Sequence, residues 1–184
     1  GYDTRTLNPL LPAYVSTVDS GNLAGALLTL AIALDRLAVE PTPEGAGAAW
    51  NEPASQLSQR CRTFFAQMNF RFLYDEQRRL FTIGFRLADA DGPGRRDRSH
   101  YDLLASEARL ASFLAIAKGE VPESHWFHLG RALTSVRGTP VLLSWSATMF
   151  EYLMPQLVMR SYPNTLLHET SHAVVRRHRE YVGG

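Results

Sequence analysis

The sequence has little cysteine, no strong excess of charge of either sign, and no long apolar run that is free of charged residues. Its one cysteine, Cys61, cannot form a disulfide within the chain. The formal net charge of +1 gives no field that would draw the chain to nucleic acid or to an anionic membrane surface. Because charged residues interrupt the apolar stretches, we expect no segment of this chain to insert into a bilayer.

What the sequence does have is the composition of a globular protein with a core. Of its 184 residues, 45% are hydrophobic and 20% are charged, as is usual for a soluble domain. The chain starts at Gly1 rather than at methionine and stops shortly after an arginine-rich segment. We therefore expect residues 1–184 to be a single fragment of a larger chain, and to be soluble by itself.

Hydrophobic periodicity predicts a mainly α-helical chain. The first predicted helix covers residues 16–38 and is apolar on nearly all sides, which favours burial between other helices. Its stripe of leucines at helical spacing consists of Leu23, Leu27, Leu30 and Leu34. The other predicted helices cover residues 54–69, 100–119, about 146–160 with a break at Pro155, and a last segment that begins near Asn164.

One segment follows the two-residue period of a strand instead. Phe70, Phe72 and Tyr74 alternate with polar residues before a polar turn, so residues 70–87 are predicted to form a β-hairpin. Stretches that contain proline and glycine at 39–53 and 88–99 are predicted loops.

Glu107 is the carboxylate that the predicted helix 100–119 places among apolar residues. On a helical wheel it shares one arc with Leu103, Leu110 and Leu114. Arg109 and Ser112 point the opposite way and are expected to face solvent. A buried carboxylate is costly unless it is paired or hydrogen-bonded. Two interpretations stay open: Glu107 is tied to a buried arginine or to backbone amides, or it is a catalytic carboxylate with a raised pKa.

Further side chains suit carbohydrate, which proteins hold with carboxylates, amides and flat aromatic faces. Tyr101 and Asp102 stand at the entrance of the predicted helix 100–119, where free N–H groups can also bind hydroxyls. Glu151 lies among apolar residues of the helix predicted at about 146–160. The remaining candidates for sugar contact are Asp19, Asn22 and Trp145. Each of these residues also has a structural interpretation, as a cap, a dipole-stabilising residue or part of an ordinary loop.

Long blocks of the sequence resemble the middle region of bacterial cyclic β-1,2-glucan synthases. The blocks are "YVSTVDSGNLAGALLTL", "FRFLYDEQRRLFTIGFR", "YDLLASEARLASFLAIAKGEVP", "HWFHLGR" and "LLSWSATMFEYLMPQLVMRSYPNTLL", which together cover nearly the whole chain. These synthases are large membrane enzymes with a glycosyltransferase domain, a glycoamylase-like domain and a cellobiose-phosphorylase-like domain. The chain resembles the glycoamylase-like part.

The resemblance implies a fold and an activity. It implies a partial (α/α)6 toroid with one β-hairpin near 70–87, and transglycosylation that cleaves linear β-1,2-glucan and closes the ring. Retaining chemistry of this kind uses two carboxylates. The resemblance places one of them at Glu107, in "YDLLASEARL", and the other in a segment beyond residue 184. The isolated fragment is therefore expected to be inactive.

The resemblance also implies surroundings. The expected partners are β-1,2-glucan oligosaccharides and the remaining domains of the parent synthase, with no cofactor and no nucleic acid. The parent is expected on the cytoplasmic side of the bacterial inner membrane, anchored by other segments. Exposed faces of inner helices would favour a homo-oligomer of the fragment. The alternative hypothesis is a non-catalytic helical scaffold or a glucan-binding segment.

A short pattern near the end of the chain suggests a different chemistry. His168, Glu169 and His172 match the H-E-x-x-H motif of zinc peptidases. On the wheel, the histidines lie beside two arginines, Arg176 and Arg179, which oppose a bound cation. A catalytic zinc also needs a third protein ligand, and none follows in a suitable place. We expect a solvated face here, opposite the predicted buried side of Leu167, Val174 and Tyr181, and a zinc peptidase stays a remote alternative.

Overall fold

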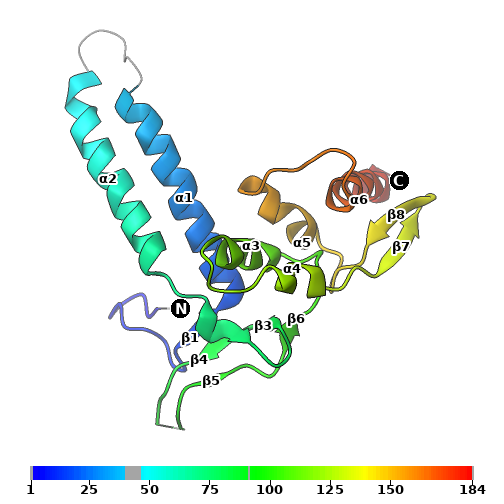
Figure 1. The fold of residues 1–184 in the computed structure, drawn as a ribbon, viewed down its shortest axis with the longest axis horizontal. Helices are drawn as coiled ribbons and strands as arrows, with labels where there is room; N and C mark the ends of the chain where they lie inside the picture. The colour runs from blue at the N-terminus through cyan, green and yellow to red at the C-terminus, as the bar shows by residue number, and fades with distance from the viewer. Residues whose placement is uncertain (1, 40–46, 91, 184) are drawn as a thin grey trace.

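The computed structural model describes residues 2–39, 47–90 and 92–183. About half of the chain is helical and the strands form small antiparallel sheets, which is consistent with the predicted mainly α class (Figure 1). The helices are α1 (Thr17–Val39), α2 (Gly47–Gln67), α3 (Arg109–Ala117), α4 (Ser124–His128), α5 (Met149–Leu153) and α6 (Leu166–Gly183), with 3-10 turns η1 (Arg71–Leu73) and η2 (Met154–Leu157). The toroid stays a prediction.

Helices α1 and α2 pack side by side and project from the rest of the molecule (Figure 1). The helix predicted at 16–38 is confirmed as α1, and the second helix starts earlier than predicted, with Pro53 inside it. Part of the predicted loop 39–53 lies outside the described residues. Ser58 Oγ donates to the backbone carbonyl of Ala31 at 3.1 Å, and Arg62 pairs with Asp35, so polar contacts also join the two helices.

The buried side of α1 is made of small residues, not of leucines. Its buried residues are Thr17, Gly21, Ala24, Gly25 and Ala31. The prediction that this helix is buried between other helices is wrong for part of its surface: Leu23 is 55% exposed and Leu30 is 45% exposed, while Leu27 and Leu34 are half-buried. Small side chains let neighbouring helices approach closely, and this leaves the larger apolar side chains on the outer face.

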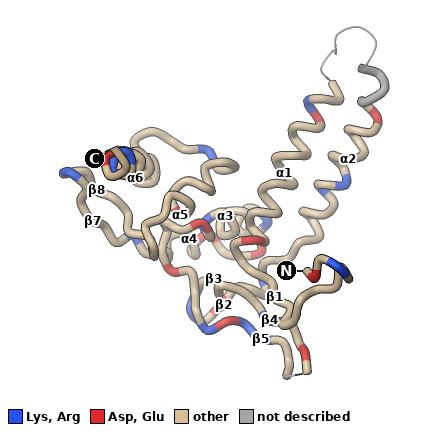
Figure 2. The backbone as a smooth tube through the Cα atoms, turned by 180° about the vertical axis from the view of Figure 1, so that it is seen from behind, with Lys and Arg blue, Asp and Glu red and all other residues tan. Residues whose placement is uncertain are grey.

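Helix α1 is long and apolar enough to cross a membrane by length and composition. Figure 2 shows no charged residue along its middle. Core helices of soluble proteins share these properties, and the expectation that no segment of the chain inserts into a bilayer stays a prediction. Here α1 packs against α2 and α3, and only 17% of the apolar window is buried.

Two three-stranded sheets lie beside the helical hairpin, built from one strand before it in the sequence and from strands after it. One has the order β1 (Tyr14–Ser16), β4 (Gly84–Arg86), β5 (Arg95–Arg96), and the other β2 (Tyr74–Asp75), β3 (Leu80–Thr82), β6 (His100–Tyr101). The hairpin predicted at 70–87 is thus confirmed in part. Its strands β2 and β3 pair, but η1 precedes them and β4 turns away to the other sheet.

The helix predicted at 100–119 is wrong in its first half. Residues 100–101 form β6, which pairs with β3, and Leu104 N donates to the carbonyl of Gly130 at 3.0 Å. Because the backbone groups of this segment bond to distant strands and loops, they cannot form helical bonds. Helix α3 begins only at Arg109.

The C-terminal part has its own core. The strands β7 (Leu133–Val136) and β8 (Thr139–Leu142) form a hairpin that was not predicted, and α6 packs on it. The helix predicted at about 146–160 is reduced to α5 and η2, with Pro155 in η2 as the predicted break. One buried cluster contains Phe70, Leu73, Phe81, Leu110 and Leu114, and a second contains Leu104, Leu129, Val141, Leu142, Tyr152 and Val174.

Candidate functional site

Glu107 lies in the turn between β6 and α3, not in a helix. Its side-chain Oε2 is buried and accepts no hydrogen bond from the residues that the structure describes. The helical wheel that singled out this residue was wrong, but the burial of its carboxylate oxygen is found. A buried acceptor without a partner is rare in folded proteins and calls for a functional or structural explanation.

Arg109 is the buried arginine next to this carboxylate. Its residue is 3% exposed, so the prediction that it faces solvent is wrong, and the same holds for Ser112 at 2%. The guanidinium donates to the backbone carbonyls of Ser106 at 3.0 Å, Glu151 at 2.8 Å and Tyr152 at 2.5 Å. Burial lowers the pKa of Arg109 to about 10, against the opposing charge of Glu107. The N–H groups of Arg109 therefore donate to backbone carbonyls, and the structure gives no hydrogen bond from Arg109 to Glu107.

The pKa of Tyr101 depends on other residues that the sequence singled out. Burial raises its pKa to about 12, and the charges of Glu107, Tyr14 and Asp19 add to this rise. The charges of Glu107 and of Asp19, at the start of α1, therefore reach the hydroxyl of Tyr101 in β6.

The close contact of α1 with α3 produces this arrangement. A Cβ added at Gly21 would lie 2.8 Å from the Cβ of Ala111, so only glycine permits the approach. Asn22 follows Gly21, and its Oδ1 is a second buried acceptor without a hydrogen-bond partner in the described chain. Within the described residues, Asn22 Oδ1 in α1 and Glu107 Oε2, two residues before the start of α3, are therefore both buried acceptors without a partner.

Tyr14 is a neighbour that sequence reasoning missed. Its ring lies against Gly84, where an added Cβ would come within 2.4 Å of the ring, and its hydroxyl bonds Asp97 Oδ2 at 3.3 Å. Burial raises the pKa of Tyr14 to about 12, with a further contribution from Asp97. Nothing local marks this residue, because its place depends on the pairing of β1 with β4.

Asp102 and Trp145 meet on the surface. The indole Nε1 of Trp145 donates to Asp102 Oδ1 at 3.0 Å, although the residues are far apart in the sequence. Trp145 is 66% exposed, and Asp102 is also exposed. Asp102 follows Tyr101 directly, so the indole lies beside the segment that carries Glu107.

Glu151 binds the loop that carries Trp145. It is 6% exposed, and its carboxylate accepts hydrogen bonds from backbone and hydroxyl groups of Ser144, Trp145, Ser146 and Thr148. Burial would raise its pKa, but these bonds outweigh burial and hold the pKa below the usual value. The bonds occupy the carboxylate, which leaves little of it for a sugar hydroxyl.

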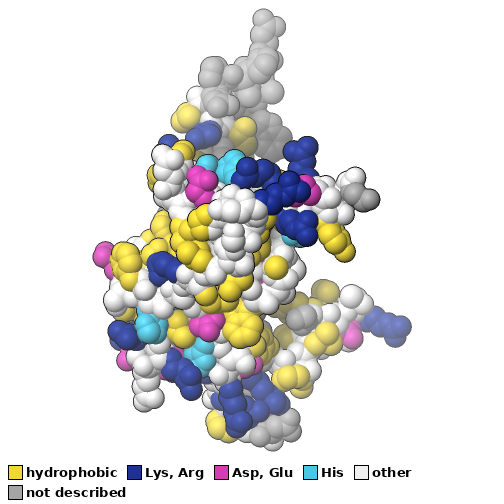
Figure 3. Space-filling view, turned by 90° about the vertical axis from the view of Figure 1, so that its right-hand side faces the viewer, with side chains coloured by type: hydrophobic (Ala, Val, Ile, Leu, Met, Phe, Trp, Pro, Cys, Tyr) yellow, Lys and Arg dark blue, Asp and Glu magenta, His cyan; other side chains and the backbone are white. Residues whose placement is uncertain are grey.

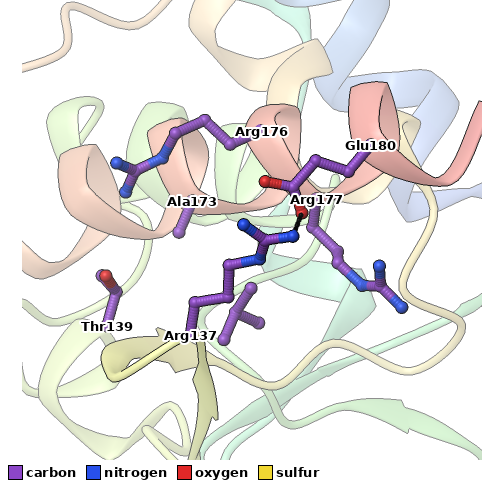
Figure 4. A pocket seen from close by; sticks show the side chains of 7 residues that line it. Arg137, Thr139, Ala173, Arg176, Arg177 and Glu180 are labelled. Atoms are coloured by element: carbon purple, nitrogen blue, oxygen red, sulfur yellow. Dashed lines mark ion pairs between the residues drawn. The ribbon is translucent and has the colours of Figure 1, made fainter. Parts of the chain in front are cut away.

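Two hollows on the molecule contain none of these residues. One of about 160 Å³ lies between the β7–β8 hairpin and α6, where Arg137 pairs with Glu180 at 3.0 Å (Figure 4). Figure 3 shows basic side chains gathered near histidines on this C-terminal side. A wider depression of about 680 Å³ is lined by residues of η1, β2 and the segment after α3, including Arg71, Tyr74 and Glu120.

The two histidines of the zinc-like motif contact one another, with ring centroids 4.4 Å apart and ring planes tilted by 48°. His168 Nδ1 also bonds Ser161 Oγ at 3.0 Å. Within the described parts of the chain, no group of three or more histidine, cysteine or acidic side chains could hold a metal ion. On this helix Val174 is buried as predicted, whereas Tyr181 is 78% exposed, so its predicted burial is wrong.

Comparison with known proteins shows a relative. The chain is 39% identical over 175 residues to the cyclic beta-(1,2)-glucan synthase NdvB of Rhizobium meliloti (strain 1021). The match covers 95% of this chain but 6% of the length of that synthase. No protein-family model matches the chain. The resemblance to cyclic β-1,2-glucan synthases is confirmed, and the match to so small a share of the relative is consistent with a fragment.

Proposed function

Since nearly the whole chain is related to one segment of a cyclic β-(1,2)-glucan synthase, we propose that it is part of a carbohydrate-active domain of such an enzyme. The domain cleaves linear β-1,2-glucan and joins its ends by transglycosylation. It is of the glycoamylase-like type, and the described helices are a portion of its (α/α)6 toroid. The parent enzyme acts on the cytoplasmic side of the bacterial inner membrane.

The observation that carries the proposal is the unpaired buried oxygen of Glu107. A carboxylate whose acceptor capacity is not used by the fold can act on a substrate, as a nucleophile or as a general acid/base. Retaining transglycosylation needs a second carboxylate about 5 Å away. A segment of the parent outside this chain supplies it, so the isolated chain does not turn over glucan.

The polar groups around Glu107 hold the sugar. Tyr101, Asp102, Asp19 and Asn22 supply the hydroxyl, carboxylate and amide groups for this role, and the charges of Asp19 and Glu107 act on the hydroxyl of Tyr101. The unpaired Oδ1 of Asn22 accepts a hydrogen bond from a sugar hydroxyl in this proposal. The partners are therefore a β-1,2-glucan chain and the remaining domains of the synthase.

The test is Glu107→Gln in the parent synthase. We expect linear glucan to accumulate while cyclic product disappears, because the amide can neither attack the anomeric carbon nor transfer a proton. Chain elongation, followed by incorporation of labelled glucose, continues. Glu169→Gln, a change at an exposed position of α6, is the matched control and leaves the cyclic product unchanged.

Normal ring closure by the Glu107→Gln enzyme would remove the catalytic assignment. If glucan binding by that enzyme still depended on the residues around Glu107, the chain would be the glucan-binding scaffold of the alternative hypothesis. Product analysis by mass spectrometry separates the two products, because a cyclic glucan is lighter by one water than a linear glucan with the same number of glucose units.

A further inference from the structure

Trp145 is an exposed aromatic residue that the protein nevertheless holds in one position. Single exposed apolar side chains are common and need no explanation. Trp145, however, is 66% exposed while its indole Nε1 is bonded to Asp102 Oδ1 at 3.0 Å. The side chain is therefore largely open to solvent, and the bond at its nitrogen restricts its rotation.

The loop under Trp145 is fixed from below by Glu151. Trp145 N donates to Glu151 Oε1 at 3.1 Å, and Ser146 N donates to both carboxylate oxygens, at 3.2 and 3.1 Å. Thr148 forms the capping box of α5 with the same carboxylate. The loop also contains Ala147 with a φ of 55°, a left-handed conformation that alanine adopts only when its surroundings enforce it.

We propose that Trp145 is a preformed stacking platform for one glucose ring of a β-1,2-glucan, and that Glu151 is the positioning residue that fixes this platform. The axial C–H bonds of a β-glucose ring form an apolar face that matches an indole in size. A rigid aromatic surface gives contact area at low cost in conformational entropy. The inference rests on the proposed function and adds a subsite to it.

The surroundings of the indole fit a sugar better than an apolar ligand. Asp102 is exposed, and a carboxylate that accepts one bond from the indole retains further lone pairs for ring hydroxyls. Asp102 is also adjacent to Tyr101, whose hydroxyl lies within the electrostatic reach of Glu107. The platform therefore lies at the edge of the Glu107 site, where a neighbouring glucose unit of the same glucan chain would extend.

The first experiment follows the indole N–H resonances of the chain by nuclear magnetic resonance during titration with linear β-1,2-gluco-oligosaccharides. Trp145→Phe identifies the resonance of Trp145 by its loss. We expect this resonance to shift on titration, and Trp145→Ala to weaken binding about tenfold. Tyr181→Ala, which removes another exposed aromatic ring, is the matched control and leaves the affinity unchanged.

The positioning role of Glu151 is tested separately. Glu151→Gln should move the Trp145 resonance in the absence of sugar, because the loop relaxes and the bond to Asp102 weakens. The same variant should weaken saccharide binding about as much as Trp145→Ala. Asp102→Ala, a change at an exposed position, breaks the indole bond without touching the buried carboxylate and should give the same direction of change.

Two results would overturn the platform. One is a Trp145 resonance that does not move at any saccharide concentration. The other is an affinity that stays the same in Trp145→Ala. In the parent synthase, Trp145→Ala should raise KM for linear glucan more than it lowers kcat, whereas Glu107→Gln removes ring closure. If Trp145→Ala left KM unaltered while Glu107→Gln abolished ring closure, the platform would be refuted and the proposed function would stand.

Discussion

The guanidinium of Arg109 donates to the backbone carbonyl of Glu151 at 2.8 Å. This bond joins the part of the molecule that contains α3 to the part that contains α5. Arg109 begins α3, whose apolar residues belong to the cluster around Leu110, whereas α5 contributes Tyr152 to the second cluster. The carbonyl of Tyr152 accepts from the same guanidinium. The arginine thus fixes the platform loop and its helix relative to the Glu107 turn.

Arg109→Met should therefore destabilise the chain by about 2–4 kcal/mol, because it leaves buried carbonyls of α5 without donors. The free energy of unfolding is measured by urea denaturation followed by circular dichroism. Arg36→Met, at an exposed position in the last turn of α1, is the matched control. Equal stability of the two variants would show that the bonds from Arg109 contribute little.

The carboxylates of Glu151 and Glu107 should affect the stability to different extents when their charge is removed. Glu151→Gln puts an NH2 group against the N–H donors of its loop, and should cost about 1–3 kcal/mol. Glu107→Gln removes a charge that the fold does not bind, and should change the stability by less than about 0.5 kcal/mol. Melting temperatures of both variants check this. A strong destabilisation by Glu107→Gln would indicate a structural role instead.

The buried side chain of His125 should lower the stability of the folded chain at mildly acidic pH. It is fully buried, its Nε2 bonds Ser112 Oγ at 2.9 Å, and Tyr74 and Phe81 pack edge-on against its ring. Burial lowers its pKa below the usual 6.5, although its bond to the carbonyl of Arg79 opposes the shift. The unfolded chain then binds the proton more readily than the folded chain does, so the stability is complete above the unfolded-state pKa and falls as the pH drops below it.

The measurement is the free energy of unfolding at about pH 7.5 and about pH 5.5. The wild-type chain should lose stability between these values, and His125→Gln should flatten this dependence even if it is less stable throughout. His172→Gln, at an exposed position of α6, should keep the wild-type slope. A slope that His125→Gln leaves unchanged would assign the pH dependence to another group.

The outer face of α1 predicts self-association of the isolated chain. Leu30 is 45% exposed and Leu37 is 56% exposed, and their spacing of seven residues places them on one side of the helix. An exposed apolar surface of this kind favours burial against a second copy. Sedimentation velocity should show concentration-dependent oligomers that the double change Leu30→Glu and Leu37→Glu disperses. Leu133→Glu, at a 52% exposed position of β7, should not disperse them.

The sequence predicted the elements whose pattern is local. The apolar stretch of α1 and the amphipathic stretch of α6 were placed within a few residues, because helical hydrogen bonds join residues four apart and the side-chain period reports them. The resemblance to glucan synthases was equally available, since it rests on the order of residues alone. The pairing of β2 with β3 followed from alternation across a short turn.

The errors arise where distant residues compete with local preference. Residues 100–108 have a helical pattern, but β3 and Gly130 take their backbone hydrogen bonds. Arg109 was expected in solvent, and the carbonyls of α5 draw it into the interior. The leucines of α1 were expected inside, and glycine and alanine take that side because they allow α2 and α3 to approach.

The candidate site also has features that the sequence predicted and features that depend on the fold. The residue types of the site, a carboxylate among apolar residues with tyrosine, aspartate and asparagine nearby, could be read from the chain by itself. That Asp102 meets the indole of Trp145, that Tyr14 lies near Tyr101, and that Glu151 serves its own loop depend on packing across tens of residues. Such contacts form only when the whole chain folds, because no local interaction specifies which distant surfaces will meet.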